Sequence, residues 1–114
     1  MRLLDVEFSR ENERGSLIQL FTGSFKQLNL LSINKGETFG GHYHKKKTEF
    51  FHLIEGEILV NINGPEGNND DYIITAGECF IVLPLDKHTI RAIDDSVLVE
   101  ALSKPYTTED VYVK

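Results

Sequence analysis

Two histidines stand one residue apart in the segment GGHYHKKKTEFF, residues 40–51. If this segment is extended, His42 and His44 point to the same face, about 6.6–6.8 Å apart along the chain, and Tyr43 points to the other. Two imidazoles on one face can bind one divalent ion at about 2.0–2.1 Å if the chain curves around it. The pair alone is weak evidence of a metal site, so further ligands have to be sought.

Two residues outside the pair have the right chemistry to join it. Glu49 begins the apolar run EFFHLI, where a carboxylate is costly to bury unless it is paired or bound to a cation. His88 follows the turn at Pro84–Lys87 and shares a strand face with Ile90. Three imidazoles and one carboxylate suit Fe(II), Mn(II), Ni(II) or Zn(II). We therefore predict one site with these ligands: His42, His44, Glu49 and His88. The alternative is a hydrogen-bonded polar cluster without metal.

Other polar residues near this segment have simpler interpretations. His52 lies three residues after Glu49 and hence on the opposite face, which favours a surface or interface position. The run Lys45–Lys47 is typical of a solvated turn, although it could also guide an anionic substrate to the mouth of the site.

Short β-branched and aromatic segments separated by turn residues predict strands, and no helical period is sustained. A single helical turn is expected near the C-terminus, with Thr107 or Thr108 as its cap. About ten closely spaced strands indicate a sandwich or barrel. The predicted strands lie near residues 3–8, 16–21, 25–34, 41–44, 49–54, 57–63, 71–76, 79–84, 88–93 and 96–103.

Length and charge restrict the possible functions. A chain of 114 residues is the size of one domain, and we predict a single domain over residues 1–114. A formal charge of -6 argues against nucleic-acid or anionic-membrane partners. The single cysteine, Cys79, cannot form an internal disulfide, and its apolar neighbours predict a buried thiol. Without an apolar segment long enough for a membrane span or signal peptide, a cytoplasmic protein is expected.

The spacing of these residues resembles a known pattern. Gly36, five residues, His42, one residue, His44, four residues, Glu49, six residues and Gly56 match the first motif of the cupin superfamily. The segment from Gly77 to Ala92 resembles the second motif, with its spacing and His88 retained but Leu83, Leu85 and Ala92 in place of a proline, a glycine and an asparagine. The resemblance implies an all-β fold, a double-stranded β-helix jelly-roll barrel.

A narrower resemblance concerns function. The segments ENERGSL, GGHYHKKKTEFF and YTTEDVY look like those of small cupins that modify sugars, including nucleotide-sugar ketoisomerases and epimerases. By that analogy His42 or His44 would be general acid and base on a carbonyl-bearing, sugar-like small molecule. The retained Glu49 and His88 favour a divalent transition metal (Fe, Mn, Ni or Zn) instead. The open alternatives are an Fe(II)-dependent dioxygenase and a non-catalytic sugar- or metal-sensing domain.

The face opposite the predicted ligands is also apolar. It carries Tyr43, Phe50 and Ile54, which suggests a sheet that is buried on both sides. We therefore expect a homodimer. The alternative is an edge that the N-terminal strands of the same chain cover.

Overall fold

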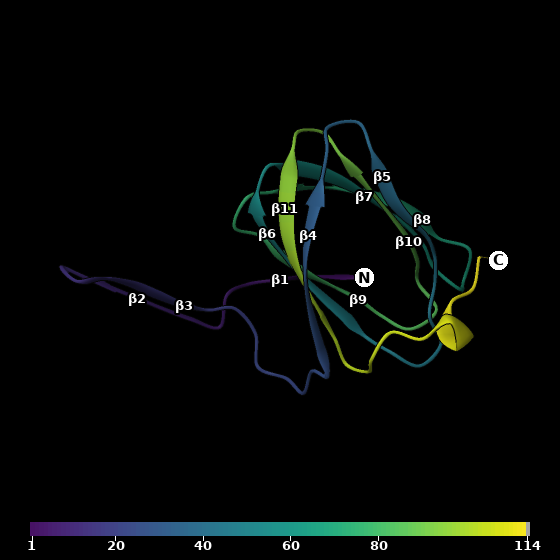
Figure 1. Ribbon diagram of the computed structural model, residues 1–114, viewed down its shortest axis with the longest axis horizontal. Helices are drawn as coiled ribbons and strands as arrows, with labels where there is room; N and C mark the ends of the chain where they lie inside the picture. The colour runs from purple at the N-terminus through teal and green to yellow at the C-terminus, as the bar shows by residue number, and fades with distance from the viewer. Residues whose placement is uncertain (114) are drawn as a thin grey trace.

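Two β-sheets face each other in this computed structural model, which describes residues 1–113, and a separate hairpin projects from them (Figure 1). The five-stranded sheet has the order β1-β9-β6-β11-β4, and the four-stranded sheet has the order β5-β10-β7-β8. The strands are β1 (Arg2–Leu4), β2 (Phe8–Asn12), β3 (Gly15–Gln19), β4 (Gln27–Ile33), β5 (Thr38–His42), β6 (Glu49–Glu55), β7 (Glu57–Asn63), β8 (Asn69–Thr75), β9 (Cys79–Val82), β10 (Lys87–Ala92) and β11 (Ser96–Leu102). This arrangement confirms the predicted all-β jelly roll.

The main core lies between the two sheets. In β7 buried and half-buried residues alternate, as expected for a strand with one face in the core. The ring of Phe51 in β6 stacks on that of Phe80 in β9, with centroids 4.8 Å apart. Leu53 and Ile58 are fully buried in the same cluster. This core fixes the two strand layers that carry the pocket residues.

A second, smaller cluster covers the outer face of the five-stranded sheet. Phe50 stacks on Phe21 with centroids 5.3 Å apart, and Phe25 packs beside them. Cys79 is buried in this cluster, as predicted. The N-terminal segment of the same chain therefore covers Phe50. This agrees with the alternative to a dimer interface, in which the N-terminal part of the same chain covers the apolar outer face. Ile54 on that face is nevertheless 49% exposed.

The first predicted strand, residues 3–8, is wrong. β1 ends at Leu4 after pairing with β9, and the chain then leaves the sheet and enters the β2–β3 hairpin at Phe8. The sequence of β2 is mostly polar, so it lacks the alternation that marks a half-buried strand. From residue 25 onward every predicted strand matches an observed one to within three residues at each end.

The C-terminal segment contains a short 3-10 helix, η1 (Thr108–Asp110), and Thr107 caps it by accepting a hydrogen bond from the Glu109 backbone amide. This confirms the predicted helical turn and one of its two proposed caps. Across the described residues, no helix is long and apolar enough to cross a membrane.

Candidate functional site

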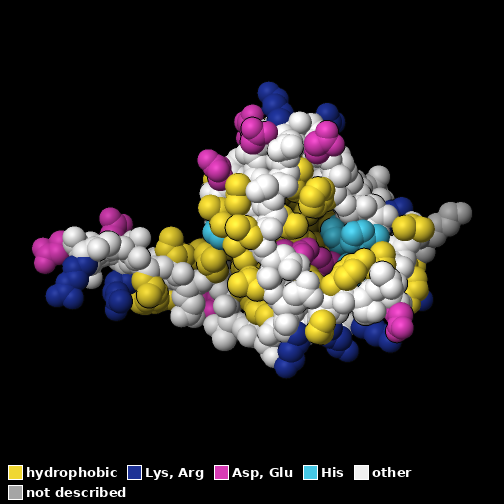
Figure 2. Space-filling view, viewed as in Figure 1, with side chains coloured by type: hydrophobic (Ala, Val, Ile, Leu, Met, Phe, Trp, Pro, Cys, Tyr) yellow, Lys and Arg dark blue, Asp and Glu magenta, His cyan; other side chains and the backbone are white. Residues whose placement is uncertain are grey.

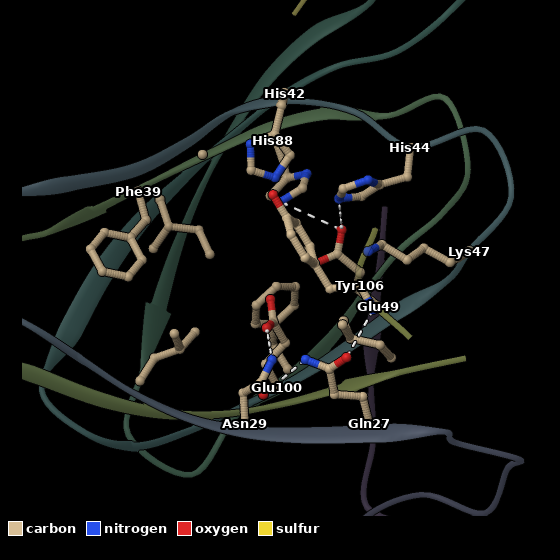
Figure 3. A pocket seen from close by; sticks show the side chains of 15 residues that line it. Gln27, Asn29, Phe39, His42, His44, Lys47, Glu49, His88, Glu100 and Tyr106 are labelled. Carbon is tan, nitrogen blue, oxygen red and sulfur yellow. Dashed lines mark hydrogen bonds and ion pairs between the residues drawn. The ribbon is translucent and has the colours of Figure 1, made fainter. Parts of the chain in front are cut away.

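The four predicted site residues come together in a pocket between the two sheets (Figure 3). His42 ends β5 and pairs directly with His88 of β10, so both side chains lie on the same side of the sheet. Their ring centroids are 4.9 Å apart, and the centroid of His44 lies at the same distance from that of His42. Glu49 enters the pocket from the opposite sheet, at the start of β6.

A β-bulge in β5 sets which side chains reach this pocket. His88 pairs with His42, and Thr89 pairs with Gly40, which leaves Gly41 as an extra residue without a partner in β10. Because side chains alternate along a strand, Phe39 and His42 would face opposite sides if β5 were regular. The extra residue turns both toward the pocket, which they line together.

Gly40 is required by a close approach of β5 to β10. Its φ is +103°, in a region that side-chain-bearing residues rarely adopt, and a Cβ atom built on it would lie 2.5 Å from the His88 carbonyl oxygen. Gly41 has a similar φ of +80°, but no atom lies within 4 Å of a Cβ built there. Both glycines therefore have a positive φ that disfavours other residues, but only Gly40 also lacks space for a side chain.

The C-terminal segment holds the loop that carries His44. The Asp110 carboxylate accepts hydrogen bonds from the backbone amides of Lys45 at 2.9 Å and Lys46 at 3.3 Å. The Asp110 carbonyl oxygen accepts a hydrogen bond from Nδ1 of His44. This fixes a proton on Nδ1 and directs Nε2 of His44 into the pocket.

Glu49 is almost completely buried and lies against two imidazoles. Its Oε1 is 3.0 Å from Nε2 of His44 and 3.7 Å from Nε2 of His88. Burial favours the neutral acid, but the contacts with His44 and His88 outweigh it and lower the pKa of Glu49 to about 2. Glu49 is therefore a carboxylate at neutral pH, which is the charge state that a metal ligand or an ion-pair partner requires.

The three imidazoles have different proton affinities. Burial lowers the pKa of His42, and the neighbouring His88 and His44 lower it further. Burial also lowers the pKa of His88. For His44 burial acts in the same direction, but Glu49 and the Asp110 carbonyl outweigh it, so its pKa is raised. The pocket thus places neutral imidazoles beside one that holds its proton more tightly, a combination suited to acid and base roles.

Glu100 of β11 also lines the pocket, although it was not among the predicted site residues. Its Oε1 accepts a hydrogen bond of 2.9 Å from the Asn29 side chain. Burial, together with the neighbouring Glu49, raises the pKa of Glu100 to about 7. The signal was present, because strand alternation places Glu100 on the face of Leu98 and Leu102, as it places Glu49 on the face of Phe51.

Lys47 contradicts the interpretation of the three lysines as a solvated turn. Lys45 and Lys46 are exposed, but the Lys47 side chain is only 2% exposed and lines the pocket. Its ammonium lies 5.0 Å from the centre of the Tyr106 ring. His52, by contrast, lies outside the pocket as predicted, and its Nδ1 is 3.2 Å from Sγ of Cys79.

The donor types fit a metal ion. Oε1 of Glu49 and Nδ1 of His88 are buried without a well-directed hydrogen bond, and a cation would suit the carboxylate. The Nδ1 bond of His44 is the kind of contact that orients a metal-binding imidazole. Among the described residues 1–113, however, no three His, Cys, Asp or Glu side chains are arranged around a common point at which an ion could be held. Binding of an ion would require the side chains to rotate.

The pocket opens on the face shown in Figure 2, where histidine and acidic side chains are visible in a hollow bordered by hydrophobic ones. Its volume is about 240 Å³. Sites for drug-sized ligands are usually about 300–1,000 Å³. This pocket is therefore suited to a group the size of one sugar ring, and a larger ligand would extend out of it.

Comparison with known proteins identifies the family. The model of the Cupin_2 family, described as the cupin domain, matches residues 29–103. The chain belongs to the cupin domain family. The matched region contains all four predicted site residues of this cupin, as well as Lys47 and Glu100. No curated protein sequence matches the chain significantly.

Solved structures with the same fold include enzymes that modify nucleotide sugars. A dTDP-4-dehydrorhamnose 3,5-epimerase from Sulfolobus tokodaii is 18% identical with a TM-score of 0.76, and the match covers 90% of this chain and 70% of that one. The 3,4-ketoisomerase QdtA from Thermoanaerobacterium thermosaccharolyticum was solved as a mutant in complex with TDP-4-keto-6-deoxyglucose. It is 16% identical with a TM-score of 0.81, and the match covers 98% of this chain and 86% of that one. A 3,4-ketoisomerase from Helicobacter canadensis is 16% identical with a TM-score of 0.81, and the match covers 99% of this chain and 90% of that one. At such identities the likeness establishes the fold of this cupin.

Proposed function

We propose that this cupin is an isomerase or epimerase that acts on a carbonyl-bearing sugar, carried by a nucleoside diphosphate. The observation that carries the proposal is the convergence of three imidazoles and a buried carboxylate in a pocket of about 240 Å³. Such a pocket takes the sugar, while the nucleotide stays outside it. The neighbouring structures support the substrate class, since they include epimerases and ketoisomerases, one of them with a bound keto sugar nucleotide.

In the proposed reaction His42 and His44 act as general base and general acid. One group removes a proton from the carbon beside the carbonyl, and the other donates a proton to a neighbouring atom of the enediol. The ring centroids of His42 and His44 are 4.9 Å apart, so their nitrogens can reach adjacent atoms of one sugar. Glu49 and His88 lie behind them and position His44 and His42 by direct contact.

The test is solvent hydrogen exchange into the sugar. In deuterium oxide the wild-type protein should incorporate deuterium next to the carbonyl of TDP-4-keto-6-deoxyglucose, observed by proton NMR. We expect His42→Asn and His44→Asn to lower the exchange rate by about 10²–10⁴-fold, the usual contribution of a general acid or base. His52→Asn is the matched control, because His52 lies outside the pocket. No exchange with any keto sugar nucleotide would refute the proposed function.

A second candidate keeps the same pocket but adds a metal ion held by His42, His44, Glu49 and His88. The buried Oε1 of Glu49, which lacks a well-directed hydrogen bond, favours it. A bound Fe, Mn, Ni or Zn ion would supply Lewis-acid polarisation of the carbonyl. Elemental analysis of protein purified without chelator should then give about one metal per chain, lost in His44→Ala.

Two alternatives lead to different measurements on the same protein. Oxygen consumption with candidate diols would identify an Fe(II)-dependent dioxygenase. A thermal shift with sugar nucleotides, without any hydrogen exchange, would identify a non-catalytic sugar-sensing domain, since a ligand at 100 times its Kd adds about 2.7 kcal/mol to folded-state stability.

We also propose that the working form is a homodimer built by the β2–β3 hairpin. The hairpin projects from the sheets in Figure 1, and Leu17 and Ile18 on it are 48% and 55% exposed. The chain has 7188 Å² of accessible surface, roughly 800 Å² more than expected for a compact monomer of 13.0 kDa. About 800 Å² is what each partner buries in a standard interface.

The edge strand β4 supplies a surface for the hairpin of a second copy. Leu28 and Leu30 are 72% and 71% exposed there. Sedimentation should show a dimer at micromolar concentration, and Ile18→Glu should shift it to monomer. Ile73→Glu, on the outer face of β8, is the control. A wild-type chain that sediments as a monomer at every concentration refutes the dimer.

A further inference from the structure

Lys47 differs from the two lysines before it in where its charge lies. Its side chain is buried and runs from the loop between β5 and β6 toward the centre of the pocket (Figure 3). Within residues 1–113 the structure shows no hydrogen bond and no ion pair to its ammonium group. The specific contact that the group makes is with the Tyr106 ring, 5.0 Å away.

This contact satisfies none of the ammonium donors. A cation over an aromatic ring is stabilised by about 0.5–2 kcal/mol, but the ring is not an oxygen acceptor, and the residue lines the open pocket. An ammonium group has three N–H donors and no acceptor. The free donors of Lys47 therefore call for an oxygen acceptor, and the pocket into which they point has room for one on a ligand.

We propose that the Lys47 ammonium is an oxyanion-binding subsite, which donates hydrogen bonds to the carbonyl oxygen of the sugar. This inference rests on the proposed function. When a histidine takes the proton from the adjacent carbon, the C–H electron pair forms the C=C bond and the carbonyl π pair moves to the oxygen. Lys47 stabilises the negative charge on that oxygen until the proton returns to carbon. The step needs no external oxidant, because the sugar is both donor and acceptor of the electrons.

The other polar groups are less suited to this task. Nδ1 of His44 is bonded to the Asp110 carbonyl, and the proposed reaction uses Nε2 for proton transfer, so this ring has no second donor to hold the substrate oxygen. Glu49 and Glu100 are acids and would repel an oxyanion when ionised. Lys47 is the buried cation whose donors remain available, and its flexible stem can follow the oxygen as charge develops.

The test compares Lys47→Met, which keeps most of the stem and removes the charge, with Lys46→Met as the matched control in the same loop. Steady-state kinetics with TDP-4-keto-6-deoxyglucose give kcat and KM, and calorimetry with TDP, which lacks the carbonyl, gives binding of the nucleotide part. We expect Lys47→Met to lower kcat and deuterium exchange by about 10²–10³-fold, as loss of an oxyanion donor does. Its Kd for TDP should stay within threefold of wild type, and Lys46→Met should change neither quantity by more than twofold.

Each outcome decides the matter. An active wild-type enzyme with kcat in Lys47→Met reduced less than fivefold overturns the subsite and leaves the proposed function standing. A higher KM at unchanged kcat also overturns it, because Lys47 would then only bind the ground state. If Lys47→Met does not fold, Lys47→Arg keeps the charge, and it should retain at least a tenth of the wild-type kcat. An Arg variant that is folded and inactive refutes a purely electrostatic role. A wild-type protein without exchange or turnover overturns both proposals.

Discussion

The contrast between Gly40 and Gly41 gives a stability prediction that the structure makes quantitative. Both residues have positive φ, so an alanine at either position has the same kind of backbone penalty, about 1–2 kcal/mol. At Gly40 the new Cβ would also lie 2.5 Å from the His88 carbonyl oxygen and 3.2 Å from Cα of Thr89. These are backbone atoms of the paired strand, so β5 and β10 must move apart.

Forcing an extra carbon into a packed site costs typically 1–3 kcal/mol. We therefore expect Gly40→Ala to lower the free energy of unfolding by about 2–5 kcal/mol and Gly41→Ala by about 1–2 kcal/mol. At about 4 °C per kcal/mol for a domain of this size, Tm should fall by about 8–20 °C and 4–8 °C. Because His42 and His88 are paired across the same two strands, Gly40→Ala should also weaken ligand binding in the pocket.

Urea unfolding followed by circular dichroism measures both free energies, and a thermal melt gives the two Tm values. The protein concentration is kept equal, since dimer formation would make Tm depend on it. If Gly40→Ala proves as stable as Gly41→Ala, the contact with the His88 carbonyl does not constrain the strands and the reasoning is refuted.

Three further predictions concern Glu100, the C-terminal segment and the core. The pKa of Glu100 is raised from 4.5 to about 7, so the folded state binds its proton more tightly than the unfolded state. The associated stability, of the order of 2 kcal/mol, is present below pH 4.5 and is lost as pH rises to 7. Urea titrations should show that Glu100→Gln removes this slope, and an unchanged slope contradicts the assignment. Asp110→Ala leaves two loop amides without acceptors and should lower the free energy of unfolding by about 1–3 kcal/mol. Glu109→Ala, at an exposed position, should lower it by under 0.5 kcal/mol. Equal losses of stability in the two variants would show that the Asp110 carboxylate does not hold the loop. Phe51→Ala, which empties a fully buried position, should cost about 3–5 kcal/mol in the same assay, and a loss below 1 kcal/mol would mean that the core collapses around it.

The strands of the two facing sheets could be predicted because each one carries a local pattern of apolar residues and turn residues. In β7 each second residue is apolar, and Gly56 and Gly77 mark turns where φ is positive. In the hairpin, the predicted strand at residues 16–21 matches β3 to within two residues at each end. β2 could not be predicted, because its residues are all exposed and mostly polar and its extended form depends on pairing with β3.

The candidate site was predictable in its residues but only partly in its charges. Alternation placed Glu49 inward and His52 outward, and the structure confirms both positions. Lys47 was misjudged because a run of three lysines carries no period that tells the buried one from its neighbours. Whether a metal binds, which residues react and whether two chains associate remain predictions, since they depend on ligands and partners that the sequence pattern does not name.

The bulge at Gly41 makes β5 tolerant of a change in chain length at one point. His42 pairs with His88, Gly40 with Thr89 and Phe39 with Ile90, so removal of Gly41 would leave these pairs in place as a regular ladder. Phe39 and His42 would then be two residues apart and would still share one face of the strand. Elsewhere in β5 a shift of one position would turn Phe39 away from the pocket. Deletions at the bulge should therefore be accepted in related chains more readily than deletions within the paired part of the strand.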